Sequence, residues 1–230
     1  MCIRDRSNHS TVGPGVAVYF RDLEDRLVEH IEAADAVFGA VAWLTSSRVL
    51  SALAGVPDAQ IVVQKEDFLR PDGEAQAAFH KRLRNQYNMV GNDLGRYEHQ
   101  STILPCMSYA HDPRMQGVRC VGNHNSDQAP TAPRMHNKFL VFARVLRLPE
   151  GQDQWSDNVG GWWPRIAPYG VWTGSFNMTV TAGRSFENAV YITGPEVVAA
   201  YYQEWAQIAA LSEPLEWSTD WMAPEWRLGS

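Results

Sequence analysis

The sequence predicts an α/β fold: an α/β/α sandwich built on a mixed, mostly parallel central sheet. Strand-like apolar runs alternate with helical segments up to residue 64, and further apolar runs follow between residues 118 and 193. Such alternation is typical of a sheet whose strands are joined by helices that pack on its faces. The composition, with 45% hydrophobic and 20% charged residues among 230, is that of an ordinary globular protein.

The first half of the chain is predicted to run strand, helix, strand, helix, strand. Residues 16–20 form a short apolar run, and Asp22 can cap a helix whose apolar residues recur at helical spacing. Residues 36–44 are almost wholly apolar, which is typical of a strand buried on both faces. The Thr-Ser-Ser run at 45–47 can cap a second helix, and residues 60–64 form a third strand. This order predicts a layer of parallel strands.

The second half is expected to add four strands and a closing helix. In order, we expect a polar helix at about 72–87, strands at 118–121, 136–146, 170–174 and 188–193, and a helix that starts at Pro195. The apolar residues of that last helix are Val197, Val198, Tyr201, Trp205 and Ile208. Proline suits a first helical turn because its missing N–H would have no partner there.

The chain divides into three expected parts. Residues 1–15 are polar and turn-forming, and we expect a disordered or artefactual leader there. Residues 16–211 form one domain with an inserted loop at 147–168. Residues 212–230 form a Trp-rich tail that is expected to pack on the domain or on a partner.

Composition limits the functional classes. Every apolar run is shorter than the ~20 residues that span a bilayer, and no apolar segment follows Arg4 and Arg6 as a secretory signal requires. Three cysteines make no disulfide framework and fit a reducing compartment. We therefore expect a soluble, cytoplasmic protein. The net charge of −6 argues against a general nucleic-acid coat protein but leaves room for a local basic cleft.

The most informative residues are polar groups at the edges of three expected strands. His136 and Lys138 open one apolar run, Ser175 and Asn177 follow another, and Glu187 precedes a third. A neutral imidazole can attack phosphorus, and a lysine can hold a non-bridging phosphoryl oxygen. Serine and asparagine add neutral donors, and a carboxylate can orient an imidazole, a role for which Glu187 is best placed. These residues predict a phosphodiester site that needs no metal and no cofactor.

An antiparallel hairpin would bring these residues together. Residues i and i+2 of a strand share a face, so the histidine and lysine point the same way, as do the serine and asparagine. If 136–146 pairs with 170–177, the start of the first strand lies beside the end of the second. The loop at 147–168 would then lie roughly 25–30 Å away, which makes its tryptophans poor candidates for substrate contacts.

Three motifs together resemble the signature of the phospholipase D superfamily, in particular its single-motif nuclease-like branch. In chain order they are His136-x-Lys138, Gly174-Ser175-x-Asn177 and Glu187-Asn188. The resemblance covers roughly residues 16–211. It implies a metal-independent phosphodiesterase that acts through a phosphohistidine, with nuclease activity as the leading expectation. One position departs from the pattern: the acid expected five residues after the lysine is Ala143.

The resemblance also implies a dimer. The sequence contains one copy of the His-x-Lys motif. His80-Lys81 does not count as a second copy, because it lacks the spacing and lies on a predicted helix. The family mechanism needs one histidine as nucleophile and a second as general acid, which a twofold homodimer with a shared site would supply. DNA or RNA is the expected substrate. A phospholipid or headgroup phosphodiesterase and a catalytically weakened nucleic-acid-binding module remain as alternatives.

Other polar residues near the motif have weaker claims on the site. His124, Asn125 and Arg134 are candidates for lining a substrate cleft because they lie close to the motif in sequence. A zinc site is a further alternative, although no paired C-x2-C exists and Cys120 is better explained as a small apolar strand residue. Its ligands would be Cys106, His111, Cys120 and His124.

Ordinary structural roles are open for several of these residues. Ser175 and Asn177 could be turn formers, and Glu187 an exposed strand residue. Lys65 and Glu66 follow a strand at the edge where ligand clefts form in α/β sheets, but a solvated turn is the preferred interpretation.

Overall fold

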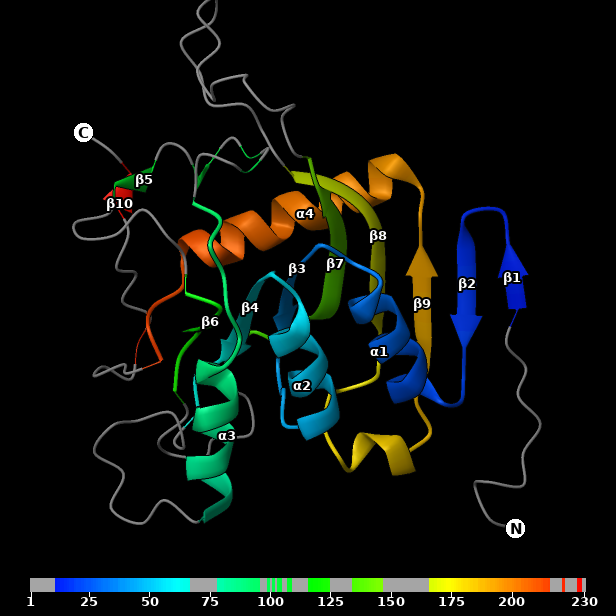
Figure 1. Cartoon of the computed structure of the whole chain (residues 1–230), viewed down its shortest axis with the longest axis horizontal. Coiled ribbons are helices and arrows are strands. Elements are labelled where there is room, and N and C mark those ends of the chain that lie inside the picture. Colours follow the sequence, from blue (N-terminus) through cyan, green and yellow to red (C-terminus); the bar gives the residue numbers. More distant parts are fainter. Residues whose placement is uncertain are drawn as a thin grey trace, which may run out of the picture.

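The computed structural model describes residues 11–66, 78–95, 99, 101, 103–104, 107–108, 116–124, 134–146, 166–215, 221 and 227–228. Within these residues the main sheet has eight strands in the order β1-β2-β9-β8-β7-β3-β4-β6 (Figure 1). Its strands are β1 (Thr11–Gly13), β2 (Val16–Tyr19), β3 (Ala36–Val41), β4 (Asp58–Gln64), β6 (Val118–Val121), β7 (Lys138–Val145), β8 (Ile166–Gly174) and β9 (Ala189–Ile192). The helices are α1 (Leu23–Glu32), α2 (Ser47–Gly55), α3 (Ala78–Asn88), the 3₁₀ turn η5 (Ala182–Arg184) and α4 (Pro195–Ala210). Strands β5 (Met107–Ser108) and β10 (Arg227–Leu228) form a separate pair.

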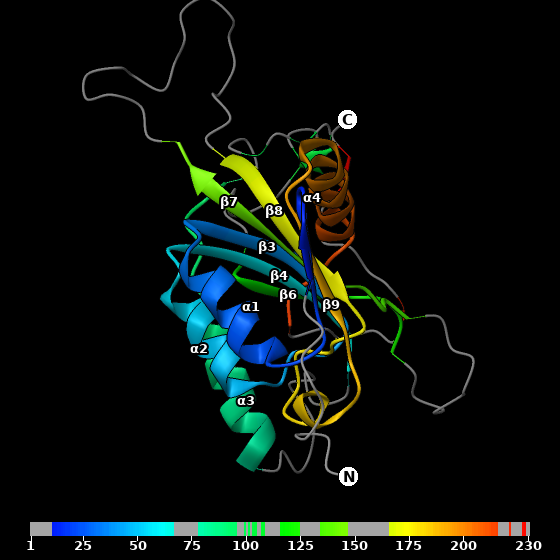
Figure 2. The same cartoon turned by 90° about the vertical axis from the view of Figure 1, so that its right-hand side faces the viewer.

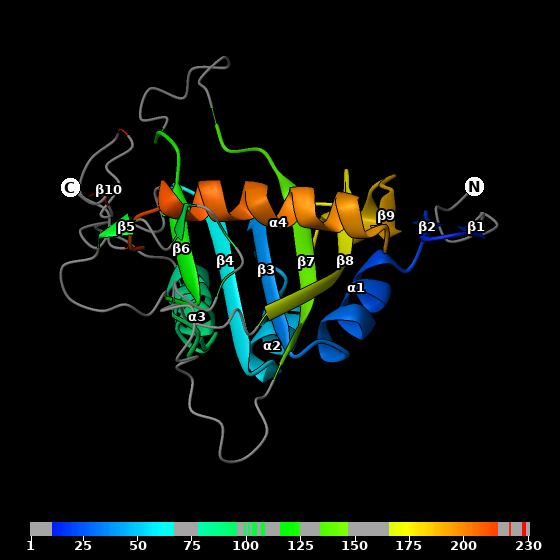
Figure 3. The same cartoon turned by 90° about the horizontal axis from the view of Figure 1, so that it is seen from above.

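Helices cover both faces of the sheet, which confirms the predicted α/β/α sandwich. Helices α1, α2 and α3 lie on one face, and α4 crosses the other (Figures 2 and 3). The core is divided in the same way. Val37 and Leu140 belong to the apolar cluster on the α1–α3 side, whereas their neighbours Phe38 and Val141 belong to the cluster under α4. Successive residues of β3 and β7 therefore serve opposite helical layers, as strand geometry requires.

The sheet is mixed, as predicted, but its hydrogen-bonded pairs are not mostly parallel. Among the strands that the structure describes, β3–β4 and β4–β6 pair in parallel, and the other neighbours are antiparallel. The first strand does not join the parallel layer, because β2 pairs with β9. The reason is the β7–β8–β9 meander, which lies between β2 and β3 and runs alternately up and down. Helix α1 therefore connects two strands that are separated by three others.

Local sequence explains most of the helix starts. Ser46 caps α2 as predicted, and its hydroxyl accepts a hydrogen bond from the Val49 amide at 3.2 Å. Asp22 occupies the N-cap of α1, but in a left-handed conformation (φ 52°) and without a side-chain capping bond. Pro195 opens α4 as predicted. Val197 of the expected apolar stripe is instead 42% exposed.

Three predicted boundaries move. Strand β1 lies inside the leader predicted at 1–15 and pairs with β2. Strand β8 starts at Ile166, inside the loop predicted at 147–168. Glu213 of the predicted tail is buried and pairs with Cys120 of β6. Strand pairing holds these residues in the fold, and composition alone did not reveal it.

Some predictions fall on residues outside the described ranges. The helix expected at about 72–87 is α3, and residues 67–77 before it are not among those described. The same holds for Trp217 and Trp226 of the tail and for residues 147–165 of the insertion. In the described part of the chain, no helix is long and apolar enough to cross a membrane.

Candidate active site

The predicted site residues gather along one edge of the sheet. Strands β3, β4, β6 and β8 end at this edge, and β7 and β9 begin there. It is the lower edge in Figure 1, beside the start of α1. The ends of strands are where ligand clefts form in open α/β sheets. Phe139 of β7 lies opposite Thr173 of β8, which confirms the predicted hairpin and puts His136 and Ser175 at the same edge.

His136 and Lys138 form the centre of the site. Nζ of Lys138 lies 3.3 Å from each ring nitrogen of His136 and donates to the His136 carbonyl at 3.0 Å. Strand β7 begins at Lys138, whereas the sequence predicted that it begins at His136. Strand alternation is therefore not what joins the two side chains, because the lysine folds back onto the residue two positions before it. His136 is exposed and Lys138 is half-buried, so a substrate can reach both.

Trp43, which the sequence analysis did not single out, supports His136. Its ring meets the imidazole edge-on with 5.2 Å between centroids, and Nζ of Lys138 lies 5.7 Å from its centroid. The indole N–H donates to Oε1 of Glu66 at 3.1 Å. Trp43 follows β3 and Glu66 follows β4, which are neighbours in the sheet. Their position just after buried strands is the signal that could have identified this pair.

Ser175 and Glu187 meet at the turn between β8 and β9. The Ser175 hydroxyl donates to the Glu187 carboxylate and accepts from the Asn188 amide at 3.1 Å. Gly174 permits this approach, because its φ of 153° favours glycine and a Cβ there would clash with the Asn188 carbonyl. The sequence analysis placed Glu187 on the imidazole. In the structure the carboxylate is held by Ser175, and both ring nitrogens of His136 face Lys138.

Asn177 is half-buried in the loop that follows Ser175. Its Oδ1 is buried and has no hydrogen-bond partner among the described residues. Its backbone carbonyl accepts from the Thr179 amide at 2.7 Å, which agrees with the turn-forming role considered for it. The loop is anchored by Phe176, which is 1% exposed. Oδ1 can only accept a hydrogen bond, so a phosphoryl oxygen would have to bind the amide nitrogen of Asn177 instead.

The charges around His136 favour its neutral form. Desolvation, followed by the positive charges of Lys138 and Arg134, lowers the pKa of His136 below its ordinary value. Desolvation also lowers the pKa of Lys138, and the charge of Glu187 opposes that shift. Glu187 is thus near enough to Lys138 to link the His136–Lys138 pair electrostatically with Ser175. Arg134, a candidate cleft residue, is exposed and acts on the imidazole through its charge.

Gln64, at the end of β4, holds the segment that leads to His136. Its side chain is buried, and its Oε1 accepts the Met135 amide at 2.7 Å. Its Nε2 donates to the carbonyls of Lys65 and Asn123, each at 3.0 Å. One side chain therefore ties the chain before the motif to the loop that follows β6.

Lys65 anchors the C-terminal segment beside the site. It is 1% exposed, its Nζ lies 2.5 Å from Oε1 of Glu213, and it donates to the Trp221 carbonyl at 2.9 Å. The solvated turn considered for Lys65 is therefore wrong. We refer to Gln64, Lys65 and Glu66 together as the β4 terminus, since these consecutive side chains hold four separate segments.

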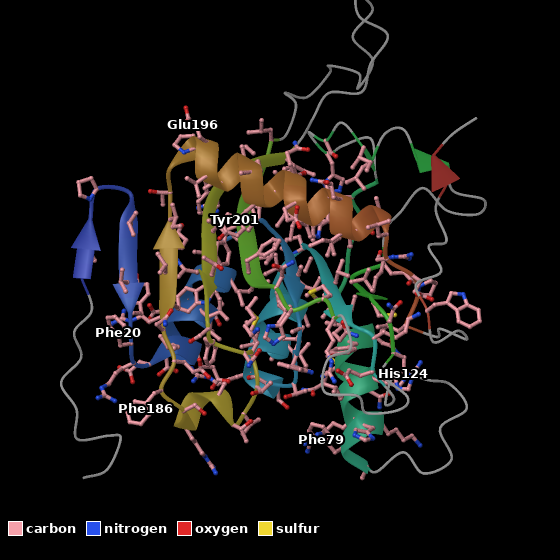
Figure 4. All side chains as sticks on the ribbon, turned by 180° about the vertical axis from the view of Figure 1, so that it is seen from behind. Phe20, Phe79, His124, Phe186, Glu196 and Tyr201 are labelled. Atoms are coloured by element: carbon pink, nitrogen blue, oxygen red, sulfur yellow. The ribbon has the colours of Figure 1, made fainter. Side chains whose placement is uncertain are left out.

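The remaining candidates lie away from the centre or outside the described ranges. His124 follows β6, three strand intervals from β7 and hence roughly 14 Å along the edge at ~4.8 Å per interval. Figure 4 shows it toward the opposite side of the sheet from Phe186. Asn125 is not among the described residues, and neither are Cys106 and His111 of the zinc alternative.

Cys120 is a buried strand residue, as predicted. It is fully buried in β6, and its thiol donates to the Pro214 carbonyl at 3.2 Å. Burial raises the pKa of this thiol to about 12, so it stays protonated near neutral pH. Across the described residues, no group of three His, Cys, Asp or Glu side chains is arranged to hold a metal ion.

Ala143 and the insertion lie at the far end of the hairpin. Ala143 is fully buried in the cluster under α4, whereas Leu140 and Phe142, which share the parity of Lys138, belong to the opposite cluster. Ala143 is five residues from Lys138, roughly 16 Å along the strand. Val145 pairs with Ile166 there, so the insertion leaves the hairpin at the end away from His136, as predicted.

Comparisons with known proteins place the chain among relatives. No family model matches it. Its structure is similar to Nuc, a phospholipase D family member from Salmonella typhimurium, with 18% identity, 87% of this chain and 97% of that chain covered, and a TM-score of 0.49. It is also similar to NucT from Helicobacter pylori, with 13% identity, 84% and 96% covered, and a TM-score of 0.47. In sequence it is 31% identical over 227 residues to uncharacterized protein L381 of Acanthamoeba polyphaga mimivirus, covering 94% of this chain and 73% of that protein. The chain therefore belongs to the family of the mimivirus protein L381.

Proposed function

We propose that the chain is a metal-independent phosphodiesterase that cleaves nucleic acid through a covalent phosphohistidine. The observation that carries the proposal is the accessible His136–Lys138 pair, whose surroundings lower the pKa of the imidazole. A neutral imidazole has a lone pair with which to attack phosphorus, and the adjacent ammonium can hold a non-bridging oxygen. The resemblance of the motif to the phospholipase D signature supports the same chemistry.

In the proposed first step, a ring nitrogen of His136 attacks phosphorus. The nitrogen–phosphorus bond forms as the bond to the leaving oxygen breaks, and that oxygen takes a proton from the imidazolium of His136 of the partner subunit. In the second step the partner's imidazole removes a proton from water. The water oxygen then attacks phosphorus and releases His136.

The other residues of the site bind the phosphoryl oxygens in this scheme. Lys138 supplies the positive charge, and the Asn177 carboxamide supplies a neutral donor. The Ser175 hydroxyl donates to Glu187 without substrate and must turn to donate to a phosphoryl oxygen. Turning away frees the Glu187 carboxylate to interact with Lys138, which supports a positioning role for Glu187.

Ala143 is the feature that favours the weakened nucleic-acid-binding module. Its place under α4, roughly 16 Å from Lys138 along β7, argues that an acid there would not touch substrate. The absence of an acid at position 143 therefore leaves the residues around His136 in place, and the catalytic proposal is preferred.

The test is hydrolysis in EDTA by wild type and His136→Ala, with DNA, RNA, phosphatidylcholine and a bis-aryl phosphodiester as substrates. The matched control is His80→Ala, a histidine of α3. We expect wild type and the control to cleave DNA or RNA, His136→Ala to lose at least a thousandfold in rate, and a radiolabelled phosphohistidine to be trapped only when His136 is present. Turnover by His136→Ala would refute the mechanism, and cleavage of phosphatidylcholine alone would establish the lipid alternative.

A further inference from the structure

We propose that the open pocket beside the site binds a base of single-stranded nucleic acid, so that the chain selects unpaired strands. This inference rests on the proposed function and names its substrate more closely. The pocket has a volume of about 390 Å³ and lies between the β2–α1 connection, the start of α2 and the loop that follows Ser175. Pockets of this size accept small planar groups.

The pocket borders the segment between Ser175 and Glu187, because Phe176, Ala182, Gly183 and Ser185 line it. Phe176, which contributes to its wall, lies between Ser175 and Asn177. In the sheet, β7, β8, β9 and β2 are successive neighbours, so the end of β2 lies three intervals, roughly 14 Å, from Lys138. A short stretch of single strand can thus place one phosphate at His136 and a nearby base in the pocket.

Two exposed aromatic side chains stand at this end of the site. Phe20, in the pocket wall, is 48% exposed, and Phe186, next to Glu187, is 64% exposed. Figure 4 shows both at the end of the sheet where β9 begins, toward the edge opposite His124. Bases of any identity stack on such side chains because every base has a π-face. In a duplex the bases already stack on one another, so this contact favours single strands.

The charges of the pocket fit a base better than a phosphate. Arg48 pairs with Asp25 and lies 3.7 Å from Glu24, so its charge is largely balanced. Arg21 and Asp22 also line the pocket, so three carboxylates and two guanidinium groups surround it. Carboxylates repel a second phosphate but accept hydrogen bonds from the N–H groups of a base. The phosphate is therefore left to His136 and Lys138, and the pocket to the neutral part of the nucleotide.

The test measures binding to full-length His136→Ala protein, which cannot consume the probe. Fluorescence anisotropy compares an oligothymidylate with an abasic oligomer of equal length and charge. We expect the oligothymidylate to bind about tenfold more tightly, and Phe20→Ala/Phe186→Ala to abolish this preference. Phe79→Ala, which removes a phenylalanine of α3 that is 42% exposed, keeps the preference.

Equal binding of the two oligomers by His136→Ala protein would overturn the proposal that the pocket binds a base. So would a preference that survives in the double phenylalanine variant. If the parent His136→Ala protein sediments as a dimer and the double variant as a monomer, the surface is an interface between copies, which would also overturn the proposal. Failure of the proposed function has a different signature: wild type would cleave neither DNA nor RNA, while the base preference in binding could still be measured.

Discussion

At the scale of single residues, the site depends on how the exposed His136 imidazole is oriented. Its side chain is not enclosed by the core, and the ring is held by edge-on contact with Trp43 and by Nζ of Lys138. Trp43 is fixed in turn by its hydrogen bond to Glu66. An exposed nucleophile needs such support because small misplacements of reacting atoms reduce rates steeply.

Replacing Trp43 is expected to slow the chemical step more than it weakens binding. Trp43→Ala removes the edge contact, and we expect kcat on a bis-aryl phosphodiester to fall about tenfold or more with KM changed much less. Trp43→Phe keeps a ring but loses the bond to Glu66, so an intermediate loss is expected. Trp221→Ala, at a tryptophan that is 67% exposed, serves as the control. Unchanged kcat in Trp43→Ala would show that the contact has no role.

Arg134 is expected to set the acid limit of activity. Desolvation and the charge of Lys138 lower the pKa of the His136 imidazole, and the positive charge of Arg134 lowers it further. Removing this charge in Arg134→Gln favours protonation, which raises that pKa. The acid limb of kcat/KM against pH is expected below 6.5 in wild type, because the pKa of His136 is lowered, and at higher pH in the variant. A limb that stays in place or moves to lower pH would contradict this assignment.

At the scale of elements, the β4 terminus holds the site together. Lys65 and Glu213 form an ion pair whose side chains are 0% and 6% exposed. Lys65→Met leaves the Glu213 carboxylate buried without its partner, which is expected to cost about 3–5 kcal/mol in the free energy of unfolding. Lys65→Met/Glu213→Leu removes both charges and is expected to recover much of that loss. Urea denaturation measures the difference, and a double variant no more stable than Lys65→Met would argue against the pair.

At the scale of the whole molecule, the proposed mechanism needs two imidazoles, and the matching motif occurs once in the chain. Mixing wild type with His136→Ala at constant total concentration, after subunit exchange, tests whether two copies share a site. Heterodimers would carry one imidazole, so activity is expected to fall as the square of the wild-type fraction. Mixing with His80→Ala is expected to leave activity unchanged. A linear fall with the fraction of wild type would indicate that each chain acts alone.

Patterns within short stretches predicted much of the fold. The strand at 118–121, the Ser46 cap and the Pro195 helix start depend on residues that are close in sequence. The hairpin of β7 and β8 was predicted from the two motifs that flank it and from strand geometry. Pairing across the sheet was harder, because any strand can hydrogen-bond with any other of suitable length. The partner of β2 was therefore missed, and the sheet was predicted to be more parallel than it is.

The sequence by itself determined the α/β/α class, the edge at which the motifs meet and the chemical nature of the His136–Lys138 pair. These depend on periodicity and on residue types within a few positions of one another. Tertiary structure alone decided that Trp43 and Glu66 support the imidazole, that Ser175 holds Glu187, and that Lys65 is buried against Glu213. Each of those contacts joins side chains from different segments, and a contact between segments depends on strand order and register, which no local pattern specifies.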